Sequence, residues 1–173
     1  RGHSVVRIER YRETRRKTRE SRWASVRERI AKEFPKFTDR ELLIAGMFLY
    51  WGEGGKTKLA TTTLSNTDPA MLLFFIHWLV LLGVSKARLR VHVHLYADMD
   101  VEKELTYWSK VLKLPRNSFR KPYIKQSNRT DLTYPQKFTH GTCNVIFENR
   151  DISEYVLQAL VHIRSLFAVK DGV

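Results

Sequence analysis

The sequence is short of cysteine and of long apolar runs, and each shortage excludes a class of protein. A single cysteine, Cys143, excludes an intramolecular disulfide framework and a zinc site built from cysteines alone, which indicates an intracellular protein. The longest apolar run, residues 70–84, contains a histidine and has 15 residues, fewer than the ~20 that a helix needs to cross a bilayer. The sequence therefore predicts no membrane span.

Acidic residues are also scarce relative to basic ones. The chain has 31 Lys and Arg against 18 Asp and Glu, which gives a formal net charge of +13 and an isoelectric point near 10.1. Such an excess favours a polyanionic partner. Because 43% of the residues are hydrophobic, the chain can fold around a core and lies outside the composition of disordered proteins.

The positive charge is concentrated at the start of the chain, where residues 1–40 hold 14 Lys and Arg against 6 Asp and Glu. Trp23, Val26 and Ile30 then recur at helical spacing until Pro35 interrupts the pattern. We expect a basic helical segment over residues 1–37 and a second domain over 38–173. The candidate phosphate contacts are Arg15, Arg16, Lys17 and Arg19. The alternative is a solvated helix with Glu–Arg pairs.

The second domain alternates helix and strand signals. Thr38 and Glu41 form a capping box, so a helix is expected over residues 39–52, ended by the glycines at 54 and 55. Asp151 with Glu154 starts the last helix in the same way. Further helices are expected over 69–82 and 101–112, strands over 59–65, 88–96 and 142–148, and a long basic connection over 115–141. Helices on one face of a mainly antiparallel sheet make an α+β domain.

The strand expected at 88–96 alternates strictly between apolar and polar residues. One side is apolar and faces the core, and the other includes Tyr96 and basic residues. A sheet surface of this kind can enter the major groove of duplex DNA. The candidate DNA contacts are Arg88, Arg90, His92 and His94, joined by Thr61 and Thr63 from the preceding strand. Simple solvation of this face is the alternative.

Two further interpretations remain open for the same region. His92 and His94 lie ~7 Å apart on one face of a strand, which suits a pair of zinc ligands with His140 or Cys143 as the third. The connection carries Arg120, Lys121, Lys125 and Arg129 interleaved with Phe119, Tyr123, Tyr134 and Phe138. Such a segment suits phosphate contacts with duplex DNA, or stacking on single-stranded nucleic acid or RNA.

The stretch GMFLYWGEG at residues 46–54 resembles the motif at a helix end in LAGLIDADG proteins, the homing endonucleases and their relatives. The order of expected elements over about residues 40–168 is similar as well. The chain looks most like bacterial members in which a helix-turn-helix and a basic helix precede a domain containing LYWxEGxK. This resemblance implies a protein of the prokaryotic cytoplasm in which residues 1–37 are the connecting helix. The first residue is Arg rather than Met, which is typical of a fragment or a processed chain.

The chain also departs from the family pattern. Glu53 replaces the commoner aspartate, and the strand expected after the motif is reduced to residues near 56–58. A helix and a basic loop over 100–141 stand where the family has a tight connection.

Glu53 raises an electrostatic question, because a carboxylate at a helix C-terminus faces the negative end of the helix dipole at a cost of up to about 1 kcal/mol. Hydration or a divalent cation can compensate. The resemblance implies the cation: Glu53 would ligate Mg²⁺ and help to activate a water against a phosphodiester, with Lys56 or Lys58 neutralising charge nearby.

A stripe of apolar and small residues on the motif helix predicts a contact with a second chain. Leu42, Ala45, Leu49 and Gly52 recur at 3, 4, 3 spacing, and Gly46 lies beside them. Because the sequence has one such motif, the second must come from an identical chain. Ordinary core packing is the alternative. The sequence thus predicts a homodimeric duplex DNA-binding protein, either a Mg²⁺-dependent site-specific endonuclease or a transcriptional regulator of the same fold that does not cut.

Overall fold

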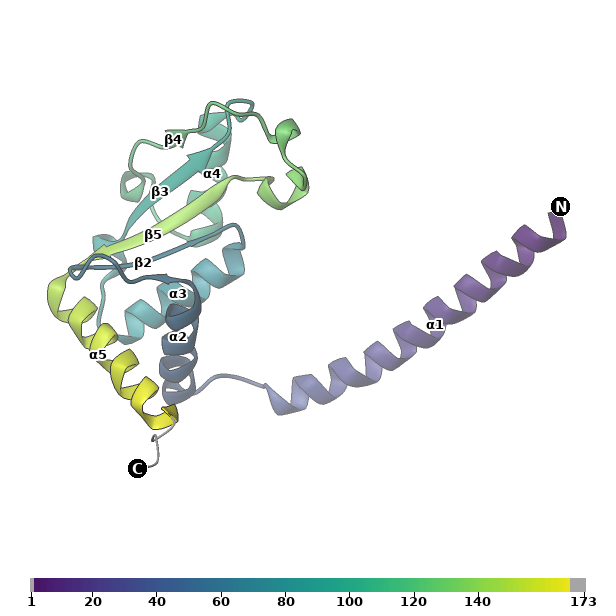
Figure 1. The fold of residues 1–173 in the computed structure, drawn as a ribbon, viewed down its shortest axis with the longest axis horizontal. Helices are drawn as coiled ribbons and strands as arrows, with labels where there is room; N and C mark the ends of the chain where they lie inside the picture. The colour runs from purple at the N-terminus through teal and green to yellow at the C-terminus, as the bar shows by residue number, and fades with distance from the viewer. Residues whose placement is uncertain (1, 169–173) are drawn as a thin grey trace. The chain divides into compact units, whose positions relative to one another are not determined.

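The computed structural model describes residues 2–168, and the chain divides after Thr38 into two compact units. The first unit is the helix α1 (Gly2–Glu33), which is labelled in Figure 1. Nearly all of its described side chains are exposed, including Tyr11 and Trp23. Ion pairs one turn apart, such as Glu13 with Arg16 at 2.9 Å, support the helix along its surface.

The second unit, residues 39–173, contains a five-stranded sheet and four of the five α-helices in the described part of the chain. Its elements are α2 (Asp39–Glu53), β1 (Gly54–Gly55), β2 (Thr61–Asn66), α3 (Pro69–Leu81), β3 (Arg90–Leu95), α4 (Val101–Leu112), β4 (Tyr123–Ile124), β5 (Thr142–Glu148) and α5 (Arg150–Phe167). The strand order is β1-β2-β5-β3-β4, antiparallel except for the parallel pair β3–β4. The predicted α+β class is confirmed. No helix of residues 2–168 has the length and apolar character needed to cross a membrane.

Side-chain caps explain where three helices begin. Asp68 accepts a hydrogen bond from the backbone N–H of Ala70 at 2.8 Å, with Pro69 as the first helical residue, and Asp100 accepts one from Lys103 at 3.0 Å. The cap of α5 differs from the prediction. Asn149, not Asp151, accepts the N–H of Ile152 at 2.9 Å, so the helix starts at Arg150.

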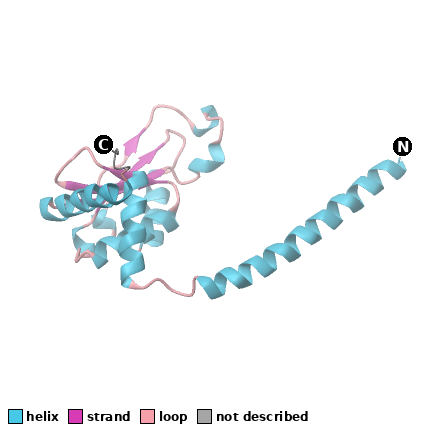
Figure 2. Ribbon diagram, turned by 60° about the horizontal axis from the view of Figure 1, so that its bottom comes forward, coloured by secondary structure: helices cyan, strands magenta, loops and turns pink. Residues whose placement is uncertain are grey.

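The sheet buries one face and leaves the other open. Side chains alternate between buried and partly exposed along β2, β3 and β5, as the 2-residue period of a strand requires. The buried side chains pack against the helices of the second unit, α2, α3, α4 and α5, which lie on one side of the strands in Figure 2. Tyr50, Phe75 and Trp78 stack together at the centre of this core, with ring centroids 5.7–6.3 Å apart.

Helices α2 and α3 pack tightly against each other at Gly46, which is buried. A Cβ at this position would come within 2.0 Å of the Trp78 ring. The Trp78 indole is held there by a hydrogen bond from its Nε1 to the carbonyl of Leu43 at 3.2 Å. Gly46 therefore serves packing within the chain, and its predicted place in a contact with a second chain is wrong.

Three local predictions are wrong because contacts between residues far apart in the sequence decide the structure there. β1 lies at Gly54–Gly55 rather than at residues 56–58. The connection over 115–141 contains 3₁₀ turns and β4. β4 pairs with β3 in parallel and forms one edge of the sheet, and the hydrogen bond from Lys125 N to Leu95 O at 2.8 Å extends this pairing. Tyr96, predicted on the polar face, is only 3% exposed because Phe138 of this connection packs against its ring.

Candidate nucleic-acid interface

The open face of the sheet carries polar side chains in rows that cross the strands. It consists of Thr61, Thr63, Ser65, Arg90, His92, His94, Thr142, Asn144, Ile146 and Glu148. In the register of the sheet, Asn144 stands between Ser65 and His92, and His94 stands between Thr142 and Tyr123. The structure thus brings five predicted DNA contacts, Thr61, Thr63, Arg90, His92 and His94, onto one surface.

A shallow hollow lies on this face, between the loop after β1 and the start of the connection. It is lined in part by Lys58, Thr61, Thr63, Arg120, Asn144 and Glu148. The Thr63 hydroxyl donates to the Asn144 side-chain oxygen, and Arg120 pairs with Glu148 at 3.0 Å. Hydrogen-bond donors and acceptors therefore lie together here, and both kinds are needed to contact base edges and phosphates.

His92 and His94 are neighbours on the open face, with ring centroids 4.9 Å apart, and His94 also lies 5.5 Å from the Tyr123 ring. Partial burial lowers the pKa of His94, and the nearby His92 and Lys125 lower it further. His94 is therefore held neutral at pH 7, and an anion at this surface would favour its protonated form.

Neither of the two proposed third zinc ligands joins the pair of His92 and His94. Cys143 points to the opposite, helix-covered face and is 0% exposed, and burial raises the pKa of its thiol. His140 is engaged elsewhere by Glu104. Within the described residues, no three His, Cys, Asp or Glu side chains come together in a way that can hold a metal ion.

Arg88 does not lie on the open face. It belongs to the 3₁₀ turn Lys86–Arg88 that precedes β3, and its guanidinium lies 5.0 Å from the ring centroid of Phe147. Phe147 is 2% exposed and points to the helix-covered side. The predicted place of Arg88 on the polar side of the strand is therefore wrong, because β3 begins at Arg90, two residues later than the alternation suggests.

The predicted contacts in the connection divide into exposed and structural residues. Lys121 is exposed beside the edge of the sheet, and Arg120 is exposed but forms an ion pair with Glu148. Lys125 lies 4.4 Å over the Tyr96 ring and 3.1 Å from its hydroxyl. Arg129 holds the connection in place through Asp98 at 2.8 Å, and hydrogen bonds from the Arg129 backbone and side chain lower the pKa of that carboxyl.

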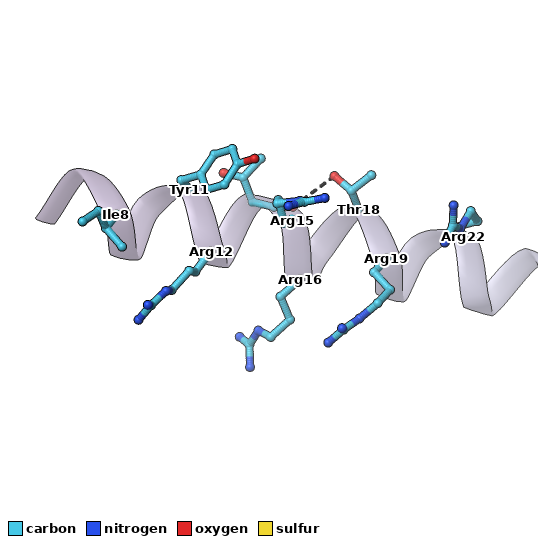
Figure 3. Close-up of a pocket in the computed structure, with 9 residues that line it drawn as sticks. Ile8, Tyr11, Arg12, Arg15, Arg16, Thr18, Arg19 and Arg22 are labelled. Carbon is cyan, nitrogen blue, oxygen red and sulfur yellow. Dashed lines mark hydrogen bonds between the residues drawn. The ribbon is translucent and has the colours of Figure 1, made fainter. Parts of the chain in front are cut away.

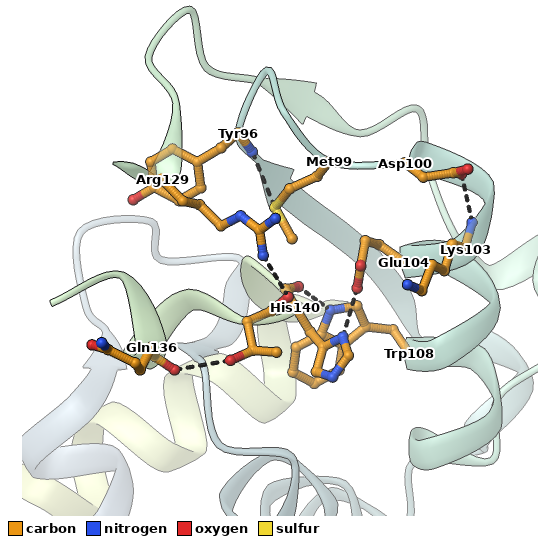
Figure 4. A network of polar contacts seen from close by, with 10 residues as sticks. Tyr96, Met99, Asp100, Lys103, Glu104, Trp108, Arg129, Gln136 and His140 are labelled. Carbon is orange, nitrogen blue, oxygen red and sulfur yellow. Dashed lines mark hydrogen bonds and ion pairs between the residues drawn. The ribbon is translucent and has the colours of Figure 1, made fainter. Parts of the chain in front are cut away.

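A polar network that the sequence analysis missed anchors the end of the connection to α4 (Figure 4). Glu104, 5% exposed, lies 2.7 Å from His140 Nδ1, and Trp108 Nε1 donates to the His140 carbonyl at 2.7 Å. The His140 ring also stacks on Tyr107 with centroids 3.4 Å apart. The sequence does contain one sign of this network. Glu104 falls on the apolar side of the predicted helix, between Val101 and Trp108, and an acid at such a position needs a buried partner. The network fixes the residues that lead directly into β5 and its row of open-face side chains.

Glu53 lies at the exposed end of α2, and it has no ion pair or hydrogen bond with any residue in the described part of the chain. The negative end of the helix is compensated by Lys56 instead. Its Nζ lies 3.2 Å from the Tyr50 carbonyl oxygen and 2.6 Å from that of Gly54. The helix end is therefore electrostatically satisfied within the chain, and the Glu53 carboxylate remains available for an external contact.

The outward face of α2 differs in part from the predicted stripe. Leu49 packs against the core, and Leu42 and Ala45 are half-buried. Gly52 is exposed and has open space around it. The exposed large apolar side chains of α2 are those of Ile44 and Phe48, which are 43% and 46% exposed. The surface available to another molecule is thus Ile44, Ala45, Phe48 and Gly52.

The predicted phosphate contacts on α1 have different local partners. Arg16 and Lys17 both lie near Glu13, at 2.9 and 3.6 Å. Arg15 lies over the Tyr11 ring and Arg19 over the Trp23 ring, at 5.6 and 5.1 Å from their centroids. Arg15 and Arg19 therefore keep a net positive charge that no carboxylate among the described residues offsets.

Comparison with known proteins yields no relative. No protein-family model, no curated protein and no solved structure matches this chain. What the protein does is therefore inferred from the surfaces described above.

Proposed function

We propose that this chain is a duplex DNA-binding protein of the LAGLIDADG type that contacts DNA with the open face of its sheet. The observation that carries the proposal is the one-sided burial of the sheet. Helices cover one face, whereas the other presents rows of hydroxyl, amide, imidazole and guanidinium groups. A β-sheet surface of this kind fits the major groove, where each base pair offers a distinct set of donors and acceptors.

Duplex DNA is favoured over single strands because the connection offers few aromatic rings for stacking. Phe119 and Phe138 pack against the core, whereas Tyr123 and Tyr134 are exposed. Of these two, Tyr123 is the one that pairs with the open face, next to His94. Single-stranded nucleic acid needs several exposed rings on which successive bases stack. Donors and acceptors in rows, with Lys58 and Lys121 exposed nearby, suit a duplex better.

The DNA-binding proposal is tested by changing neighbouring open-face residues. A binding sequence is first selected from random duplexes with the unmodified protein. His92→Ala with Asn144→Ala is then expected to weaken binding of that sequence by 10-fold or more, since a good base contact contributes about 1–3 kcal/mol. Lys110→Gln, on the helix side, is the control and is expected to leave this affinity nearly unchanged. Equal affinities for all three proteins would contradict the proposal.

The element order supports the LAGLIDADG type. Helix, strand, strand, helix, strand, strand and helix follow one another in the second unit, with α4 and β4 inserted before the last strand. The motif-like residues end α2 at an exposed Glu53. A second copy that contacts Ala45, Phe48 and Gly52 would bring a second Glu53 to the same end of the paired helices.

Glu53 fits a Mg²⁺ site in such a dimer, because Mg²⁺ is commonly bound by one or two carboxylates together with substrate phosphates. When bound, Mg²⁺ stabilises negative charge on a phosphate and lowers the pKa of a bound water. The chain's own contribution is to hold the Glu53 carboxylate at the rigid end of α2. Lys58 lies on the same side of the sheet as the open face and is placed to contact phosphate.

Cleavage is tested with the selected duplex and Mg²⁺. The unmodified protein is expected to nick this duplex, whereas Glu53→Gln is expected to bind it equally well in EDTA and not to cut. Glu154→Gln, an exposed acid on α5, is the control and keeps cleavage. Equal cutting by Glu53→Gln would remove Glu53 from the mechanism.

A second candidate function is a transcriptional regulator that binds without cutting. The observation that favours it is the position of Lys56, which already satisfies the end of α2, so that the fold itself does not require a cation at Glu53. Tight binding of the selected duplex in EDTA, with no cleavage in Mg²⁺ or Mn²⁺, would decide for the regulator.

A further inference from the structure

The charges of α1 are distributed unevenly around the helix axis. With 3.6 residues per turn, positions spaced 3, 4 and 3 residues apart fall on one face. This spacing aligns Arg12, Arg15, Arg19 and Arg22, which together are called the arginine face. In Figure 3, Arg12 and Arg19 project from one flank of this face and Arg15 and Arg22 from the other. Three acids, Glu13, Glu20 and Glu28, fall on the opposite side of the helix, whereas Glu9 lies next to Arg12 at the border of the face and Glu33 is the last residue of α1.

The ion pairs of α1 leave the arginine face unneutralised. Glu13 pairs with Arg16 and Lys17, and Glu20 lies 3.9 Å from Arg16. No member of the arginine face pairs with a carboxylate among the described residues. All four side chains belong to exposed residues. The helix therefore presents guanidinium donors with their full charge on one side.

The charge of this face opposes a parallel, in-register pairing with a second copy of α1. The 3, 4, 3 spacing is that of the contact positions of a coiled coil, and the apolar residues Ile8 and Val26 extend the same stripe at both ends. A parallel, in-register pair of α1 helices would set arginine against arginine at four successive contact positions. Like charges at the centre of such a seam oppose pairing.

A lipid surface also fits poorly. A helix that lies on a membrane buries a continuous apolar face and turns its basic residues away from it. Here the four arginines interrupt the apolar stripe over about 15 Å of helix. The acids on the far side would also repel an anionic surface if the helix were turned over.

A DNA duplex matches the arginine face in both charge and dimensions. An α-helix with its side chains is about 10–12 Å wide, and the major groove is about 12 Å wide. The two flanks of the face can then each meet one of the phosphate strands that border the groove. Guanidinium groups bind phosphate oxygens through two parallel hydrogen bonds.

We propose that the arginine face docks α1 on the phosphates of duplex DNA, as a sequence-independent contact separate from the open face of the sheet. The inference rests on the proposed function for the identity of the duplex, and adds a second surface to it. Phosphate contacts position a protein and strengthen binding, but they carry no direct sequence information. The arginine face therefore raises affinity for any duplex, whereas the open face sets the preference among duplexes.

The test compares two variants of the whole chain that lose the same charge. One replaces Arg12, Arg15, Arg19 and Arg22 with Gln, and the control replaces Arg7, Arg10, Arg27 and Lys32 with Gln. Gln has a helix propensity close to that of Arg and Lys, and circular dichroism checks that α1 remains helical. Affinity for a random duplex is measured between about 50 and 200 mM salt.

The arginine-face variant is expected to flatten the slope of log affinity against log salt by about 3 to 4, because each lost phosphate contact removes about 0.9. The control is expected to change the slope by less than about 1. A third variant with Lys at the same four positions keeps the charges and is expected to restore most of the slope. Equal flattening by the first two variants, or none by the arginine-face variant, would overturn the inference.

Two further measurements separate this inference from the proposed function and from a lipid partner. The arginine-face variant is expected to weaken the selected and the scrambled duplex equally, whereas His92→Ala with Asn144→Ala removes the preference between them. If only His92→Ala with Asn144→Ala changes duplex binding, the inference about α1 fails and the proposed function stands. If only the arginine-face variant changes duplex binding, the inference stands and the proposed contact through the open face fails. Tighter binding to phosphatidylserine vesicles than to duplex, lost in the arginine-face variant, would also overturn the inference.

Discussion

Adding one methyl group at Gly46 tests the tight packing of α2 against α3. In Gly46→Ala the new Cβ would lie 2.0 Å from Trp78 Cδ1 and 2.3 Å from its Nε1. The indole has no room to withdraw, because it is 0% exposed and packs against the rings of both Tyr50 and Phe75, with centroids 5.9 and 5.7 Å away. The two helices must therefore move apart, or the Trp78 ring must leave its present position.

The cost can be worked out from these contacts. Forcing an extra carbon into a packed core costs about 1–3 kcal/mol, and loss of the hydrogen bond from Trp78 to Leu43 adds about 1 kcal/mol. The higher helix propensity of Ala returns about 1 kcal/mol. We expect Gly46→Ala to lower the free energy of unfolding by about 1–3 kcal/mol, or roughly 4–12 °C in Tm for a unit of this size.

The matched control is Gly52→Ala on the same helix, where a Cβ would have nothing within 4 Å. This variant is expected to unfold at the same denaturant concentration as the unmodified protein or slightly higher. Urea unfolding is followed by tryptophan fluorescence at two protein concentrations, together with the solution mass. A Gly46→Ala protein of unchanged stability would refute the packing argument. So would a variant that alters only the solution mass, which would place Gly46 between chains.

Two more predictions concern ionisable groups in the second unit. A lowered pKa of His94 in the folded state means that its contribution to stability is present above the ordinary value of 6.5 and is lost as pH falls through the folded pKa. Contact with phosphate favours the protonated form of His94, so duplex affinity is expected to rise as pH falls below 6.5. His94→Gln is expected to flatten this part of the plot of affinity against pH. A plot that His94→Gln leaves unchanged would contradict the place of His94 in the DNA contact. His140→Ala leaves the Glu104 carboxylate buried without its partner and is expected to destabilise the unit by about 1–3 kcal/mol in urea unfolding. In a double-mutant cycle with Glu104→Gln the two losses should be far from additive, and simple additivity would show that the pair does not act together.

Helices and central strands could be predicted from the sequence because their signals are local. Capping residues and Pro69 place the start of α3, and the alternation of residues 89–95 places the buried side of β3. Thr61, Thr63, Arg90, His92 and His94 follow directly from this alternation, and all five lie on the open face.

The remaining features depend on contacts between residues far apart in the chain. β1 consists of two glycines and has no side-chain pattern, so it is defined only by its pairing with Thr63 and Leu64. Tyr96 continues the alternation of β3, but the connection folds back and covers it. Gly46 looks like any small residue on a helix surface until Trp78, 32 positions later in the sequence, is placed against it.

The two borders of the sheet are formed by very short strands. β1 and β4 have two residues each, whereas the inner strands have six or seven. An exposed border strand is a template for pairing with another polypeptide, and a short one offers few free backbone groups for this. Association of copies through a continuous sheet is therefore disfavoured, as is the fibrous aggregation that such growth leads to. Two copies joined through their α2 helices, as proposed above, leave the open face of each sheet accessible in the assembled molecule.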